Sequence, residues 1–251
     1  MRILELFSGT HSIGKAAKSR GYEVVSLDRD LGGECILGSG YKSDTHIKKD
    51  IMDWDFTEYP PNHFDLITAS PVCLWWSKLR QTWIGRKCKS IHPTDIITQE
   101  HLDRDIEKYG VPMVDKVFEI INYFQPKHWW IENPKTGFMK RYIAAAYPEY
   151  NTYYDIDYCK YSDWGYQKPT RFWTNMKDFT PKTCKKDCEN MIEINGRKVH
   201  KIKMGMENTT KERKEKIEKE NIDKPNYNSK RYERYRIPEK LINDFFENIS
   251  R

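Results

Sequence analysis

The sequence predicts an α/β fold, with a doubly wound, mostly parallel sheet covered by helices on both faces and interrupted by one small insertion. Over residues 1–178, short apolar runs alternate with segments of helical periodicity, which is typical of β-α-β units with right-handed crossovers. Residues 179–229 hold few apolar residues and a long charge run. An amphipathic pattern returns in residues 230–251, so we expect this segment to pack back on the main domain.

The individual elements follow from periodicity and from residues that interrupt it. Apolar runs that end in turn residues or proline predict strands at residues 2–7, 22–28, 46–54, 64–71 and 128–134. Apolar residues at helical spacing predict helices at residues 12–20, 111–124, 140–147 and 236–249.

Composition limits the class of protein. The 43 basic and 37 acidic residues give a net charge of +6, which favours a polyanionic partner without establishing one. The six cysteines are irregularly spaced, the first residues do not resemble a secretory signal, and no apolar run is long enough to span a bilayer. We therefore expect reduced thiols, no membrane, a monomer and a cytoplasmic location, or the host cell interior if the protein is viral.

The first predicted strand ends in a glycine turn that is typical of nucleotide-binding sheets. The run LFSGTHSIG supplies Gly9 and Gly14, where backbone amides can approach a ligand. Asp28 ends the second strand, where a carboxylate can accept hydrogen bonds from ribose hydroxyls. Asp50, before Ile51 at the end of the third predicted strand, is placed to accept from an adenine amino group. An ordinary strand-to-helix turn, a turn aspartate and a helix cap are the respective alternatives.

Reactive side chains follow the fourth and fifth predicted strands. Cys73 comes after the strand that ends in ITASP, and Glu132 and Asn133 end the next. The carboxyl ends of parallel strands meet at one edge, so we expect Cys73 and Glu132 to share a crevice. Arg171, in QKPTR, is placed to reach it from the following hairpin. The alternative for a lone cysteine is a small buried hydrophobe.

The motifs ELFSG, ASPVC, IENP and YSDWGYQKPTRFW occur in this order. In this respect the chain resembles the DNA cytosine C5-methyltransferases, above all their compact phage and viral forms. The resemblance covers residues 1–178 and the final segment around RYRIP. It implies the Rossmann-like fold of class I S-adenosylmethionine-dependent methyltransferases and double-stranded DNA as the partner, with the insertion as a target-recognition region.

Carried over to this sequence, the resemblance also implies the site. Cys73 would be the nucleophile, Glu132 would hold the cytosine ring nitrogen and amino group, and Arg171 would position the base. The residues implied to contact S-adenosylmethionine are Phe7, Ser8, Gly9, Thr10, Asp28, Asp50 and Pro71.

The sequence departs from the family pattern at three places. Val72 precedes Cys73 where the family usually has proline, although Pro71 lies one residue further back. His11 stands where glycine is common, which predicts a reshaped cofactor loop. The family's Gln-x-Arg-x-Arg motif is matched only loosely by Gln167 and Arg171.

The residue types suit cytosine methylation. Cytosine C5 is a poor nucleophile, and addition of a thiolate to C6 makes it reactive toward a sulfonium methyl group. A base inside a duplex must be extruded first. The aromatic and basic segment 74–90 is interpreted as a loop that closes over the flipped base. The alternative is a buried aromatic turn followed by a solvated basic stretch.

The insertion has features of its own. Cys184, Cys188 and His200 suggest a structural zinc site, but the sequence shows only three ligands, and unligated surface cysteines are the alternative. Residues 208–220 begin with Thr209 and Glu212 in a capping-box arrangement and predict a charged, solvated helix.

Other functions fit parts of this pattern. An RNA or free-nucleotide cytosine methylase would use the same cysteine, although a nucleotide enzyme would not need the basic segment. A catalytically silent nucleic-acid-binding module would not need Gly9, Asp28, Cys73 and Glu132 in combination. An amino-methyltransferase would want Asn or Asp and an aromatic residue at the SPVC position.

Overall fold

The computed structural model describes the whole chain except residues 30–40, 89–90, 203–214, 216–234 and 251. At its centre is a seven-stranded sheet with the order β3-β2-β1-β4-β7-β9-β8. The strands are β1 (Arg2–Leu6), β2 (Glu23–Leu27), β3 (Thr45–Ile47), β4 (Leu66–Ala69), β7 (His128–Pro134), β8 (Tyr153–Asp157) and β9 (Pro169–Thr174). All neighbours pair in parallel except β9, which is antiparallel to β7 and β8. The predicted Rossmann-like, doubly wound, mostly parallel fold is confirmed.

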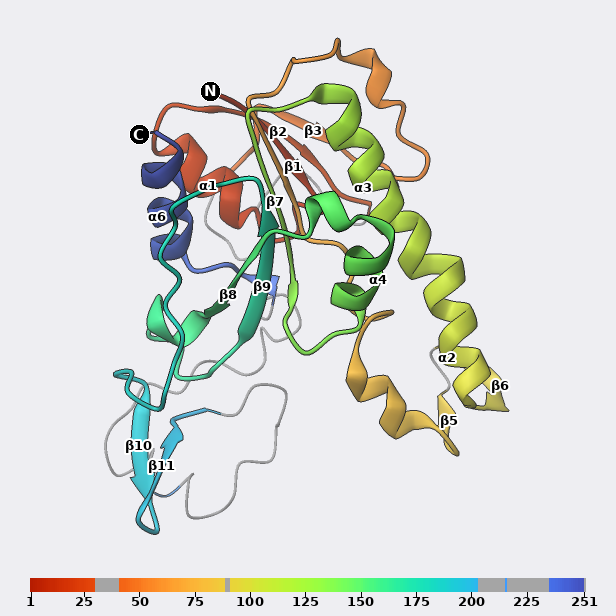
Figure 1. Cartoon of the computed structure of the whole chain (residues 1–251), viewed down its shortest axis with the longest axis vertical. Coiled ribbons are helices and arrows are strands. Elements are labelled where there is room, and N and C mark those ends of the chain that lie inside the picture. The colour runs from red at the N-terminus through yellow and green to blue at the C-terminus, as the bar shows by residue number, and fades with distance from the viewer. Residues whose placement is uncertain (30–40, 89–90, 203–214, 216–234, 251) are drawn as a thin grey trace.

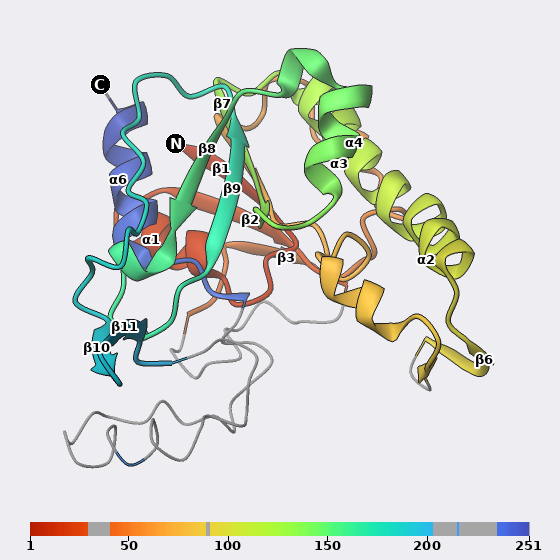
Figure 2. The same cartoon turned by 60° about the horizontal axis from the view of Figure 1, so that its bottom comes forward.

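Helices cover both faces of the sheet (Figures 1 and 2). One face packs against α1 (Ser12–Lys18) and α6 (Glu239–Ile249), and the other against α3 (Val111–Phe124) and α4 (Met139–Ala146). Because both faces are covered, β4 is buried at all four positions, as its continuous apolar run predicts. In α6 the apolar face is fully buried, and the Ile237 backbone N–H before it donates to Ser12 Oγ at 3.1 Å.

The third strand is shorter than predicted. It ends at Ile47, whereas the sequence suggested a strand through residue 54. The two lysines after it are exposed, and Asp50 then closes a turn in which its Oδ1 accepts from the Met52 backbone N–H at 3.0 Å. Such a side-chain turn competes with strand pairing, so Ile51 and Trp54 are buried as part of a loop.

Two smaller units project beyond the carboxyl ends of the parallel strands. The first comprises hairpin β5 (Lys87–Cys88) and β6 (His92–Ile96), helix α2 (Gln99–Asp105) and a π-helical turn at Ile106–Gly110 that joins α2 to α3. The second is hairpin β10 (Met191–Ile194) and β11 (Arg197–His200). Short 3₁₀ helices occupy Phe56–Glu58, Lys78–Trp83, Pro148–Tyr150 and Tyr158–Lys160.

Part of the predicted insertion 179–229 is described, namely residues 179–202 and Glu215. The predicted charged helix at residues 208–220, with Thr209 and Glu212, lies outside the described residues apart from Glu215. The proposed domain boundaries stay predictions. Within the part of the chain that the structure describes, none of the helices has the length and apolar character needed to cross a bilayer.

Candidate active site

Cys73 lies at the topological switch point of the sheet. β1 is flanked by β2 on one side and β4 on the other, and ligands of open α/β sheets bind where the strand order reverses in this way. Cys73 follows the end of β4 by four residues and is half-buried. The Pro71 carbonyl accepts a hydrogen bond from Asn133 Nδ2 at 2.9 Å, which fixes the segment before Cys73 to the end of β7.

Glu132 is buried near the carboxyl end of β7 and has two donors on one oxygen. Its Oε1 accepts from Tyr158 Oη at 3.0 Å and from Lys168 Nζ at 3.3 Å. The Lys168 and Glu132 side chains are 8% and 9% exposed, so this is a buried ion pair. Tyr158 and Lys168 were not predicted as site residues. Lys168 lies within QKPTR, in which Arg171 was the residue predicted to reach the site.

The same two charges act on Cys73. Burial raises the pKa of the Cys73 thiol, the Glu132 carboxylate raises it further, and the Lys168 ammonium lowers it. β4 pairs with β7, and Asn133, next to Glu132, donates to the carbonyl of Pro71, two residues before Cys73. The structure therefore brings Cys73 and Glu132 to the same edge of the sheet, as the sequence predicts, and adds a lysine. With its pKa raised, the resting Cys73 is a thiol at neutral pH.

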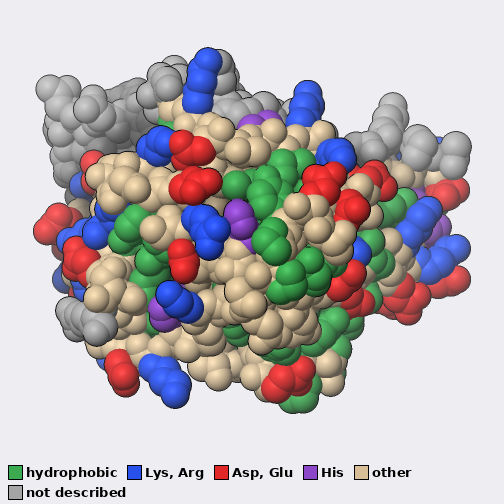
Figure 3. Space-filling model, turned by 90° about the horizontal axis from the view of Figure 1, so that it is seen from above, with side chains coloured by type: hydrophobic (Ala, Val, Ile, Leu, Met, Phe, Trp, Pro, Cys, Tyr) green, Lys and Arg blue, Asp and Glu red, His purple; other side chains and the backbone are tan. Residues whose placement is uncertain are grey.

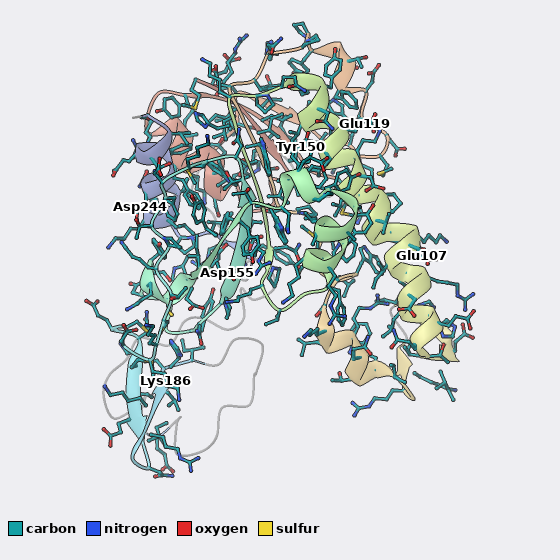
Figure 4. The ribbon with its side chains drawn as sticks, viewed as in Figure 1. Glu107, Glu119, Tyr150, Asp155, Lys186 and Asp244 are labelled. Carbon is teal, nitrogen blue, oxygen red and sulfur yellow. The ribbon has the colours of Figure 1, made fainter. Side chains whose placement is uncertain are left out.

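Arg171 points away from this group. In the β7–β9 ladder it pairs with Asn133, whereas Glu132 pairs with Phe172, and successive strand residues face opposite sides of a sheet. Arg171 makes a bidentate ion pair with Asp155, with N–O distances of 2.7 and 3.0 Å. Asp155 lies on β8, as Figure 4 shows. Its guanidinium also lies 3.5 Å from the Tyr153 ring centre. The structure thus does not bring Arg171 to Glu132.

Arg171 instead belongs to a group of basic side chains. Burial lowers the pKa of Lys140, and the nearby charges of Arg171 and Lys78 lower it further. Lys78 is exposed and begins the 3₁₀ helix in the segment after Cys73. The Asp155 carboxylate, which pairs with Arg171 and Lys135, raises the pKa of Lys140, so part of this positive charge is neutralised.

The loop after β1 has an irregular backbone. Phe7, Gly9 and His11 have φ values of 56°, 47° and 52°, the left-handed region that favours glycine. His11 is fully buried there, with Nδ1 3.5 Å from Glu5 Oε2. His11 therefore adopts a glycine-like backbone conformation and contacts a buried carboxylate, and the reshaping of the cofactor loop stays a prediction.

Asp28 holds this loop. The Gly9 backbone N–H donates to Asp28 Oδ2 at 3.0 Å. This hydrogen bond joins the loop after β1 to the residue that follows β2. Ser8 and Thr10 are buried in the same loop. Asp50 caps its own turn and lies 3.5 Å from the Arg29 guanidinium.

The segment after Cys73 has two large buried side chains and one exposed apolar side chain. Trp76 is buried and stacks on Tyr142 at 5.5 Å. Arg80 is buried as well and forms an ion pair with Asp105 of α2. The side chain of Leu79, which directly precedes Arg80 in the chain, is 74% exposed. The buried aromatic turn, which was the alternative interpretation of segment 74–90, is thus present, and the Leu79 side chain projects from it into solvent.

A second cluster of chemically active side chains lies at the insertion. Cys184, Cys188 and His200, which the sequence suggested as metal ligands, come together, and Cys159 joins them. The ligand atoms all lie within 4.8 Å of one another. Cys159 was missed because it is distant in sequence and outside any metal-ligand spacing.

Comparison with known proteins gives the family. No family model matches the chain. Over 195 residues the chain is 42% identical to the "Probable DNA (cytosine-5)-methyltransferase" of Frog virus 3 (isolate Goorha), covering 76% of this chain and 79% of the viral protein. The chain belongs to the DNA (cytosine-5)-methyltransferase family. The family predicted from the motifs is confirmed, and with it the assignment of the chain as a methyltransferase enzyme.

Solved structures show more distant likeness. A SAM-dependent methyltransferase from Archaeoglobus fulgidus aligns at a TM-score of 0.31 and 14% identity, over 59% of this chain and 51% of the solved one. A mutant of Spodoptera frugiperda DNMT2 aligns at 0.40 and 15%, over 72% and 53%. This methyltransferase therefore spans about half the length of each of those chains.

Proposed function

We propose that this enzyme transfers a methyl group from S-adenosylmethionine to C5 of a cytosine in double-stranded DNA, through a covalent adduct on Cys73. The relative's name supports the reaction class. The observation that carries the proposal is the grouping of a half-buried Cys73 with Glu132 and Lys168 at the switch point of the sheet. A nucleophile beside a carboxylate that is itself held by a cation is what addition to a cytosine ring needs.

The loop after β1 fits S-adenosylmethionine. Asp28 follows β2 and accepts from the Gly9 amide. A carboxylate at this position binds ribose hydroxyls in sheets of this type, so Asp28 would bind the ribose of S-adenosylmethionine. Phe7, Ser8, Gly9 and Thr10 would line the cofactor, with Pro71 on the adjacent strand end. Asp50 would lie toward the adenine. When bound, S-adenosylmethionine supplies the electrophilic methyl group.

Cys73 opens and closes the reaction. Its thiol gives its proton to solvent, and the sulfur forms a bond to cytosine C6 while the C5–C6 π electron pair shifts toward C5 and N3. After C5 has been methylated, its proton leaves to a base and the bond between the Cys73 sulfur and C6 breaks. The sulfur departs with the electron pair, so Cys73 is regenerated as a thiolate.

Glu132 would hold the cytosine edge during this addition. Tyr158 and Lys168 both donate to its Oε1, so Oε2 would accept from the cytosine amino group. Lys168 would lie beside the edge where negative charge develops and would stabilise it. A fixed charge aimed at developing charge is an effective catalytic device.

The surface at the carboxyl ends of the strands suits a duplex with one base turned out. The units containing β5–β6 and β10–β11 lie on either side of this edge (Figures 1 and 2). Lys78 is exposed and Lys140 is half-buried, and both would contact phosphates. At the opposite end, acidic and basic side chains are interspersed (Figure 3). Extrusion of the base costs a few kcal/mol, which contacts by the exposed Leu79 would offset.

The test is transfer of tritiated methyl groups to duplex DNA, single-stranded RNA and dCTP. Wild type should label C5 of cytosine in the duplex, and Cys73→Ser should give no transfer while still binding S-adenosylmethionine. Cys88→Ser is the matched control and should retain activity. Transfer by Cys73→Ser at a near wild-type rate would exclude the nucleophile. Preferred labelling of RNA or dCTP would replace the proposed substrate.

A further inference from the structure

The group of Cys159, Cys184, Cys188 and His200 matches the ligand set of a structural metal site. Three thiolates and one imidazole are a common set for tetrahedral zinc. We propose that this chain binds one Zn²⁺ through these four side chains, and that the metal joins the inserted hairpin to the catalytic domain.

The distances agree with a tetrahedral ion. With Zn–S of about 2.3 Å and Zn–N of about 2.05 Å, a tetrahedral centre separates a sulfur from a nitrogen by about 3.6 Å. His200 Nε2 lies 3.5 Å from Cys184 Sγ and 3.4 Å from Cys188 Sγ. One ring nitrogen thus lies between two sulfurs at ligand spacing.

Backbone hydrogen bonds fix the loop that contains two of the cysteines. Cys184 and Cys188 lie at the two ends of a short loop that carries Lys186 (Figure 4). The Cys184 backbone N–H donates to Asp157 Oδ2 at 2.7 Å, and the Lys185 backbone N–H donates to Asp187 Oδ1 at 3.0 Å. These hydrogen bonds fix the loop from which the two sulfurs project.

The hairpin needs such support because it has little core. β10 and β11 have four residues each, and an isolated two-stranded hairpin is marginally stable. Asn190 is buried and donates from Nδ2 to the carbonyl oxygens of Cys159 and Ser162, at 2.9 and 2.7 Å. A metal on Cys159 would strengthen the same junction.

The junction lies next to the catalytic group. Cys159 is in the 3₁₀ turn Tyr158–Lys160, and Tyr158 donates its hydroxyl to Glu132. The Tyr158 backbone N–H also donates to the Lys168 carbonyl at 3.3 Å. A metal on Cys159 therefore holds the turn from which Tyr158 reaches the carboxylate.

The experiment measures metal directly, without activity. The full chain, purified under reducing conditions without chelator, should contain one zinc per chain by elemental mass spectrometry. Cobalt substitution should give the intense visible absorption of a tetrahedral Co²⁺ thiolate. Cys159→Ser and Cys188→Ser should lose the metal or bind it at least about tenfold more weakly, and His200→Cys should retain it as a four-cysteine site.

Cys73→Ser is the control and should keep one zinc. Removal of the metal by a chelator should increase amide hydrogen exchange in residues 158–165 and 184–200 while leaving β1 and β4 protected. Protein without metal and without a Co²⁺ thiolate spectrum would overturn the proposal, as would a disulfide among the three cysteines. These outcomes do not depend on methyl transfer, so failure here is distinguishable from failure of the proposed function.

Discussion

Replacement of Lys168 by methionine should destabilise the protein strongly. Lys168 Nζ lies 3.3 Å from Glu132 Oε1, and both side chains are less than a tenth exposed. At an effective dielectric constant of about 20, the attraction at this distance is about 5 kcal/mol. Desolvation offsets much of this attraction in the intact pair, but removal of one partner leaves a buried charge and costs about 3–5 kcal/mol.

We expect the lower end of this range for Lys168→Met. Tyr158 still donates to the same carboxylate oxygen, so Glu132 keeps one partner. A loss of about 3 kcal/mol in the free energy of unfolding corresponds to a fall in Tm of about 6–12 °C for a chain of this size. Urea and thermal unfolding of the full chain measure both quantities.

The double variant separates charge from packing. Glu132→Gln with Lys168→Met removes both charges, and its loss should be smaller than the sum of the two single losses by at least about 1 kcal/mol. Lys127→Met is the matched control. Its lysine is 78% exposed and lies 3.5 Å from Asp65, and exposed pairs contribute at most about 1 kcal/mol. A Lys168→Met loss equal to that of the control, with additive effects in the double variant, would refute the buried pair.

Three further outcomes are expected. Burial and Glu132 raise the Cys73 pKa. The rate of alkylation of Cys73 by iodoacetamide, measured on its peptide, should therefore rise about tenfold per pH unit from pH 7 to 9 and be higher in Glu132→Gln. A plateau in this rate below pH 8 would contradict the raised pKa. Asp28→Ala should weaken S-adenosylmethionine binding about 10- to 100-fold in calorimetry, since hydrogen bonds to charged groups contribute about 1.5–3 kcal/mol; an unchanged Kd would remove Asp28 from the site. Arg171→Leu should lower stability by about 2–3 kcal/mol through loss of the Asp155 pair without changing Cys73 alkylation, and an altered alkylation rate would return Arg171 to the catalytic group.

The central sheet was predictable because its signals are local. The parallel strands β1, β2, β4 and β7 are short segments rich in apolar residues, and a chain that alternates such segments with helices has few possible topologies. The same topology predicts that the carboxyl ends of these strands meet at one edge of the sheet. Cys73 and Glu132 were therefore placed together from their positions after neighbouring strands.

The errors and omissions at the candidate site involve contacts between segments that are distant in sequence, whereas the third strand was predicted too long because of the local turn at Asp50. The face on which Arg171 projects depends on the β7–β9 register, since a shift of one residue reverses every side chain. Lys168 was missed because a lysine before a strand is usually solvated. The role of Cys159 depends on how the turn at Tyr158–Lys160 meets the insertion, which no spacing along the chain encodes.

The most direct test of the proposed chemistry is trapping on duplex DNA that contains 5-fluorocytosine. Fluorine at C5 cannot leave as a proton does, so a chain that adds a thiolate to C6 stays attached after methylation. We predict a denaturant-stable complex that forms only with S-adenosylmethionine and whose adduct maps by mass spectrometry to the Cys73 peptide. Methylation of ordinary cytosine DNA by the same preparation, with no trapped complex or with the adduct on another residue, would contradict the account.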